Sequence, residues 1–245
     1  DVLLKLEVQY LEHNLLGLGW QFRLPFRYAL STTDYLRIGS ITPTVNFIRP
    51  GGTNLDIEVK AIAEIDRATD QLDRTEFGIY SGLTWPIMNA MPLTFGLDFG
   101  VICFRNPDAA DPWCRVEDYS PQFRPSIRWR WDTQDNPLNP TKGFMLSSEF
   151  KYIFGQSRDE LLTLDADESV GSELSNFLKW ETSAEFAIDT PIGLIIAGLV
   201  RYGGSFQLGG DGGALLPSNE VFTLGGSNGL RGFADHAVGR YDSAG

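Results

Sequence analysis

Long segments of the chain alternate between apolar and polar residues, and this period of two constrains the fold more than any other feature. From Leu18 to Leu30 the even-numbered positions are apolar or aromatic, while Gln21, Arg23 and Arg27 lie between them. Successive side chains of a β-strand point to opposite faces, so the pattern predicts a strand with one apolar and one polar face. Similar segments begin near residues 2, 55, 77, 93, 123, 144, 178 and 194, and 34–48 is less regular. No convincing helical period is present, and the chain is predicted to be all-β.

The length of these segments and the character of their connections favour a membrane barrel. Soluble strands are commonly about 5–6 residues long, and a tilted strand needs about 9–11 residues to cross the hydrocarbon of a bilayer. The segments here reach about 11 to 14 residues. Short connections (11–17, 49–54, 88–92, 134–142, 189–193) alternate with mostly longer, polar ones (68–74, 105–120, 155–176 and everything after 209). Short turns at one end and long loops at the other are typical of outer-membrane barrels.

A soluble β-sandwich is the alternative, because it also alternates with one face buried. Sandwich strands are shorter, however, and their outer faces rarely hold so many charges opposite such an aromatic-rich face. In a barrel the apolar face meets lipid, and Arg124, Arg128, Glu181 and Glu185 line a wet lumen where they stay solvated or paired. Four tryptophans are then candidates for the membrane interface, with simple apolar cover as their other reading: Trp20, Trp85, Trp129 and Trp180.

Composition excludes several other classes of protein. The net charge of −12 makes nucleic acid an unsuitable partner, since phosphate binding needs a cationic face. The longest apolar run, Pro191–Val200, is about half of the roughly 18 residues that a membrane helix needs. No signal peptide is visible at Asp1, and the chain begins inside an alternating segment, so we expect a mature or truncated product.

Two cysteines, Cys103 and Cys114, flank a stretch rich in Pro and Asp. Cysteines that bracket a loop suggest a disulfide in an oxidising compartment, and two unpaired thiols are the alternative. A metal site needs more ligands than these cysteines and two distant histidines provide. We expect no metal and no cofactor.

Catalytic readings of the glycine-rich segment near the end of the chain fail on context. Gly225–Gly229 has the form G-x-S-x-G, but no helical pattern follows Ser227. Asp235 and His236 are adjacent and follow within nine residues, unlike the partners of a hydrolase serine. The glycines also miss the dinucleotide and P-loop patterns. The acidic run 159–173 lacks the ligand spacing of a calcium loop and is read as a solvated loop. We expect no enzymatic activity.

The segment "FTLGGSNGLRGF" resembles the signature of the outer-membrane protein assembly superfamily, whose barrels are BamA- or TamA-like. In that family a long outer loop folds back into the barrel and carries a Val/Ile-Arg-Gly-Phe/Tyr tip. The tip positions here are Leu230, Arg231, Gly232 and Phe233, with Leu230 replacing the commoner Val. The resemblance implies that Arg231 pairs with acidic and aromatic side chains of later strands. The preceding loop glycines would allow the tight backbone path: Gly225, Gly226 and Gly229.

Two further motifs match the same family in its order along the chain. "WDTQDNPLNPTKG" resembles the family's periplasmic D-x-R-D-N-P-x-x-P-x-x-G turn, with Gln134 where Arg is usual, and "NLLGLGW" resembles a glycine turn near the start of these barrels. The turn-motif residues are Asp132, Asp135, Asn136, Pro137, Pro140 and Gly143. The resemblance implies that residues 1–245 are one partial barrel of about ten to eleven strands, roughly the second to the eleventh of sixteen. The POTRA domains and closing strands would lie outside this chain.

The resemblance also implies a function and a location. Members insert client β-barrel proteins into the outer membrane without ATP, and a secretion pore that exports a partner protein is the alternative. The implied partners are membrane lipid, unfolded outer-membrane clients, periplasmic chaperones and accessory lipoproteins. The implied location is a Gram-negative outer membrane, with an organelle outer membrane as the second choice.

Overall fold

The computed structural model describes residues 3–31, 38–66, 73–88, 90–105, 114–136, 139–157 and 173–208. The chain divides into two compact units, Asp1–Ala214 and Leu215–Gly245, and every described residue belongs to the first. Within the described ranges, no helix has both the length and the apolar character needed to cross a bilayer. The only helical segments there are two short 3-10 turns, η1 (Pro50–Gly52) and η2 (Val116–Asp118).

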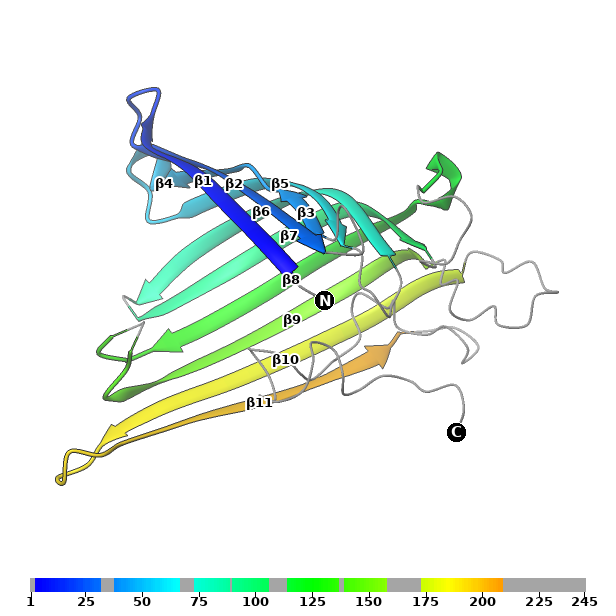
Figure 1. The fold of residues 1–245 in the computed structure, drawn as a ribbon. Coiled ribbons are helices and arrows are strands. Elements are labelled where there is room, and N and C mark those ends of the chain that lie inside the picture. The colour runs from blue at the N-terminus through cyan, green and yellow to red at the C-terminus, as the bar shows by residue number, and fades with distance from the viewer. Residues whose placement is uncertain are drawn as a thin grey trace, which may run out of the picture. The chain divides into compact units, whose positions relative to one another are not determined.

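The described residues form one antiparallel sheet in which sequence neighbours pair, except that β3 and β4 do not pair with each other and both pair with β2 and β5 (Figure 1). The strands are β1 (Leu3–Leu15), β2 (Trp20–Ser31), β3 (Ile38–Ile41), β4 (Thr44–Ile48), β5 (Asp56–Asp66), β6 (Asp73–Met88), β7 (Met91–Arg105), β8 (Ser120–Asp132), β9 (Gly143–Ser157), β10 (Glu173–Asp189) and β11 (Ile195–Gln207). The all-β prediction is confirmed, and several strands are longer than the alternation suggested.

The short turns meet at one end of the sheet, here called the turn end, because successive crossings run antiparallel, with β3 and β4 forming one crossing. These turns join β1 to β2, β4 to β5, β6 to β7, β8 to β9 and β10 to β11. The longer connections meet at the opposite end, here called the loop end. Six crossings separate the Asn14–Trp20 turn from the Asn136–Gly143 turn when β3 and β4 are taken as one crossing, as the sequence predicts.

Two strand boundaries differ from the sequence-based expectation. The segment 34–48 is not one irregular strand, since β3 and β4 separate at Thr42 and Pro43. Pro43 has no N–H to donate, and Thr42 reaches the carbonyl of another proline, Pro25, at 3.4 Å. The predicted loop 155–176 is also too long, because β9 runs on to Ser157 and β10 begins at Glu173. These ends pair through backbone hydrogen bonds that do not require an alternating apolar pattern.

The sheet presents its large apolar side chains outward rather than to a core. Ile79 is 59% exposed and Phe99 is 56% exposed, and both belong to the predicted apolar face. The opposite, polar face holds several of the most buried groups, including Glu76, Gln122 and Arg124. An exposed apolar face with buried charges behind it is the reverse of a soluble protein and fits a wall between lipid and a polar interior.

The tryptophans divide into two sets along the strands. Trp20, Trp85 and Trp129 each lie within three residues of the turn end of their strands, as an interfacial position requires. Trp180 lies near the middle of β10, where its Nε1 donates to Thr182 Oγ1 at 2.8 Å and its ring stacks on Phe150. Trp180 therefore lies farther from the ends of its strand than the other three tryptophans, and its place at the interface stays a prediction.

Candidate functional site

The predicted Asn-Pro turn between β8 and β9 is organised around the carboxylate of Asp135. Asp135 Oδ1 accepts the backbone N–H groups of Thr141 at 2.9 Å and Lys142 at 3.1 Å, and Oδ2 accepts the Thr141 hydroxyl at 2.6 Å. These donors, the hydroxyl first, lower the pKa of Asp135 to about 2 although its side chain is exposed. The Asp135 carboxylate therefore satisfies two backbone N–H groups of the turn and holds the β9 side of the turn to its β8 side.

The same turn is closed at its base by Thr133 and Gly143. Thr133 N donates to the carbonyl of Phe144 at 2.9 Å, and Thr133 Oγ1 accepts from Phe144 N at 3.0 Å. Gly143 has φ +103°, and a Cβ there would overlap the Thr133 carbonyl oxygen. Glycine is therefore required for both conformation and space.

The remaining motif residues flank this centre. Asp132 accepts hydrogen bonds from Gln134 N at 3.0 Å and from Arg130 Nη2 at 2.6 Å, and Asn136 Oδ1 accepts one from Asn139 N at 3.3 Å. Pro140 lies in the described part of the turn, whereas Pro137 lies outside the described residues. Lys142 Nζ is 3.9 Å from Asp189 Oδ2, which connects the turn to the end of β10.

The first glycine turn, between β1 and β2, has a comparable design. Asn14 Oδ1 accepts Gly19 N at 2.8 Å, and the Asn14 carbonyl accepts Gly17 N at 3.0 Å. Gly17 and Gly19 have φ +73° and +71°, which explains the two glycines of the motif. Leu16 also has a positive φ of 58° and is 81% exposed.

A charge cluster on the polar face joins four strands near the loop end. Arg124 on β8 is 2.5 Å from Glu76 Oε1 on β6 and 3.0 Å from Asp98 Oδ1 on β7. Arg74 is 2.6 Å from Glu64 on β5 and 3.8 Å from Glu76. The side chains of Arg124 and Glu76 are only 6% and 8% exposed. Buried charges of this kind persist only when they are paired, so the cluster holds β5 to β8 in one register.

Glycine makes room for this cluster against the wall. Gly100 on β7 pairs with Gly78 on β6, and a Cβ on Gly100 would lie 3.3 Å from Arg124 Nη2. The guanidinium can therefore approach the backbone closely. The sequence pattern identified Arg124 as a polar-face residue but did not identify Glu76 and Asp98 as its partners. The strand register would have identified Asp98, because Asp98 lies directly opposite Arg124 on β8. On its other side Asp98 lies opposite Tyr80 on β6.

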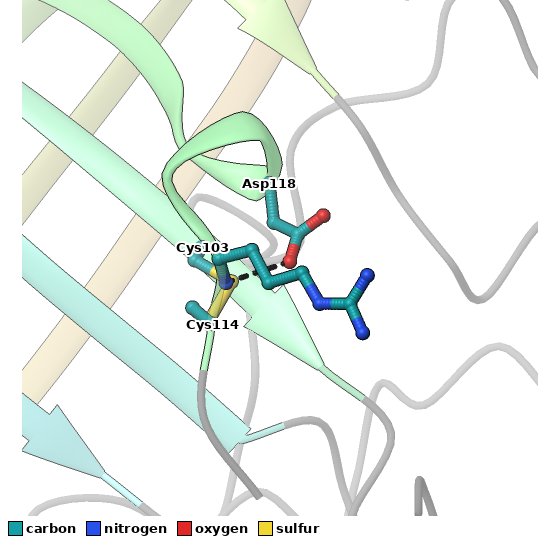
Figure 2. Close-up of a disulfide and its surroundings, with 4 residues drawn as sticks. Cys103, Cys114 and Asp118 are labelled. Atoms are coloured by element: carbon teal, nitrogen blue, oxygen red, sulfur yellow. Dashed lines mark hydrogen bonds between the residues drawn. A yellow bond between two sulfur atoms is a disulfide. The ribbon is translucent and has the colours of Figure 1, made fainter. Parts of the chain in front are cut away.

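The two cysteines are joined in the structure by a disulfide (Figure 2). Cys103 is on β7, 1% exposed and in register with Thr75, and its Cα lies 6.4 Å from that of Cys114. Immediately after Cys114, Arg115 N donates to Asp118 Oδ2 at 2.8 Å and begins η2. The bond therefore ties the last part of β7 to the part of the β7–β8 connection that precedes η2.

The predicted loop tip lies outside the described residues. This applies to Leu230, Arg231, Gly232 and Phe233, to the loop glycines Gly225, Gly226 and Gly229, and to the rejected catalytic residues Ser227, Asp235 and His236. Most of the acidic run 159–173 lies outside them as well. The structure therefore brings together the residues within each turn motif and, at the opposite end of the sheet, those of the charge cluster. It leaves the loop-tip residues as a prediction.

Comparisons with known proteins agree with the motifs. A family model described as the Omp85 superfamily domain matches residues 14–245. A solved structure of BamA from Haemophilus ducreyi lacking POTRA domains 1-3 has a similar fold, with a TM-score of 0.72 at 15% sequence identity. That match covers 95% of this chain and 43% of the BamA chain, so this chain spans less than half the length of that structure. No curated protein matches the sequence.

Proposed function

The chain belongs to the Omp85 superfamily, an outer-membrane family, and from this premise we propose that it is the barrel part of an insertase. The insertase folds client β-barrel proteins into the outer membrane without ATP. The observation that carries the proposal is the family match over 14–245, because that range includes the glycine turn, the Asn-Pro turn and the Leu-Arg-Gly-Phe tip together.

The physical basis of insertion is the unpaired backbone of a strand edge. Such an edge is a template on which an incoming strand forms hydrogen bonds, so no chemical energy source is required. The partners of this activity are unfolded outer-membrane clients and the surrounding lipid, with periplasmic chaperones and accessory lipoproteins delivering the clients. A Gram-negative outer membrane is the location that suits these partners.

Arg231 is the residue that we assign to the inward loop tip. A guanidinium remains charged in a partly desolvated lumen and binds carboxylates with two parallel hydrogen bonds, which suits the anchoring of a loop to an inner wall. Phe233 would pack beside it. The acidic partner of Arg231 lies on later strands in this proposal.

The test uses the full-length protein in liposomes with an added unfolded porin. Folding of the porin is followed by its heat-modifiable mobility on a gel. We expect folding to be faster than in empty liposomes, and we expect Arg231→Ala to remove most of the acceleration. Arg240→Ala is the matched control, since it removes the same charge from the same segment but outside the tip. No acceleration by the wild-type protein contradicts the insertase and favours a secretion pore. Acceleration that Arg231→Ala leaves intact contradicts the role of Arg231 alone.

A further inference from the structure

The disulfide lies at the loop end of the sheet, and this position limits the stage of assembly at which the bond can form. Cys103 is near the end of β7 and Cys114 precedes β8, so both belong to the loop end of the sheet (Figure 2). The Asn-Pro turn belongs to the opposite end, with the other short turns. Outer-membrane barrels carry their short turns on the periplasmic side and their longer loops outside. An inserted barrel therefore carries the Cys103–Cys114 bond on the outer side of the membrane.

We propose that this bond forms in the periplasm before the chain enters the membrane, and that the unfolded chain is a substrate of a periplasmic thiol–disulfide oxidant. The inference rests on the outer-membrane location of the family and is independent of the insertase activity. After insertion, the membrane separates the two sulfurs from the periplasm and its oxidants.

Burial gives a second reason for early formation. Thiol–disulfide exchange requires a thiolate to approach a sulfur atom of the other molecule directly. With the disulfide formed, Cys103 is only 1% exposed and lies in register with Thr75 on β6. A protein-sized oxidant cannot reach this position on the folded sheet, whereas it reaches both cysteines on an extended chain.

The short spacing makes the reaction possible without any native structure. The two cysteines are 11 positions apart in sequence. A loop of about 10 residues closes in roughly 10–100 ns, so the two thiols meet often in an unfolded chain. No pairing of β7 with β6 or β8 is needed to bring them together.

The chemistry is an ordinary two-electron exchange. One cysteine thiolate attacks the disulfide of the oxidant, forms a mixed disulfide and releases one oxidant thiolate. The second cysteine thiolate then attacks the sulfur of the first and releases the other oxidant thiolate. The two protein thiols give up two electrons and two protons, and the oxidant becomes a dithiol.

The early bond has a structural consequence for β7 and β8. The bond keeps the ends of the two strands close while the chain crosses the periplasm. It therefore lowers the cost in loop-closure entropy when β7 and β8 pair. The pairing of these strands places Asp98 opposite Arg124, so the bond closes the same hairpin that contains these two members of the charge cluster.

The test is a pulse-chase of the full-length protein in a Gram-negative host. Samples are chilled at mildly acidic pH, and folded and unfolded species are first separated on an unheated gel by their heat-modifiable mobility. Each species is then denatured, and its free thiols are tagged with a high-mass maleimide. Adducts are counted against the Cys103→Ser/Cys114→Ser variant. We expect the unfolded species to lack both adducts from the earliest time, and to carry two in a host without the periplasmic oxidant.

Either of two results would overturn the proposal. One is a folded barrel that first appears with two adducts and loses them later. The other is equal oxidation of the unfolded species in both hosts. Because wild-type protein is followed, the test does not depend on whether a cysteine variant folds. Insertase activity is read separately in liposomes, so each proposal can fail alone.

Discussion

Arg124→Met in the full-length protein is expected to destabilise the barrel strongly. The side chain of Arg124 is 6% exposed and neutralises Glu76, 8% exposed, and Asp98, 23% exposed. Removing one partner of a buried ion pair costs about 3–5 kcal/mol, because the other charge stays buried without compensation. Arg74 remains 3.8 Å from Glu76 and offsets part of this loss, so we expect about 3 kcal/mol. That corresponds to roughly a hundredfold change in the unfolding equilibrium constant.

Arg128→Met is the matched control, since it lies four residues along the same strand and on the same face. Arg128 also pairs with a carboxylate, Glu149, at 3.0 Å, but its side chain is 54% exposed. An exposed pair contributes about 0.2–1 kcal/mol. The two substitutions are chemically identical, so the difference between them reports the burial of the Arg124 cluster together with the second carboxylate that Arg124 neutralises.

The assay is urea unfolding of the protein in lipid vesicles, followed by tryptophan fluorescence and by heat-modifiable mobility. A rescue variant, Glu76→Gln in the Arg124→Met background, is expected to recover part of the loss by removing the uncompensated carboxylate. The reasoning is refuted if Arg124→Met and Arg128→Met lower stability equally. It is also refuted if Glu76→Gln makes the Arg124→Met protein less stable.

The remaining predictions concern the Asn-Pro turn. Gly143→Ala is expected to lower the free energy of unfolding by about 1 kcal/mol or more beyond the effect of Gly193→Ala. Both glycines have a positive φ, but only at Gly143 would an added Cβ meet backbone atoms. Equal unfolding midpoints of the two variants in urea would argue against this. The folded pKa of Asp135, lowered to about 2 from 3.8, means that its stabilisation of the turn is complete above pH 3.8 and is lost as the pH falls through about 2. NMR titration of the Asp135 carboxyl checks this, and a midpoint near 4 would contradict it.

The alternation of apolar and polar residues predicted most of the fold because each strand has two environments. Ile127 and Arg128 are neighbours with opposite requirements, and the pattern alone assigns them to opposite faces. The turns were predictable for a related reason, since Asn14, Gly17 and Gly143 are needed for hydrogen bonds or positive φ within a few residues.

The charge cluster was not predictable in the same way. Arg124 and Glu76 are 48 positions apart, and their contact depends on the register of three strands that no local pattern determines. The break between β3 and β4 was missed because it depends on Pro43 together with the pairing of Thr42 to the carbonyl of Pro25 on another strand. The pairing of Ser157 with Glu173 was also not predicted, because the strand ends there lack the alternation of apolar and polar residues.

The central claim is that one face of the sheet meets lipid and the other a polar interior, and adjacent residues on β8 test it most directly. Ile127→Cys and Arg128→Cys each receive a nitroxide in the full-length protein, reconstituted in vesicles. Ile127 is 47% exposed on the apolar face, and Arg128 lies beside it on the polar face. The power saturation of each label is then compared in oxygen, which concentrates in lipid, and in a water-soluble nickel chelate. The account predicts that oxygen relaxes the Ile127 label more and nickel relaxes the Arg128 label more. The same preference at both positions, or the reverse order, would contradict it.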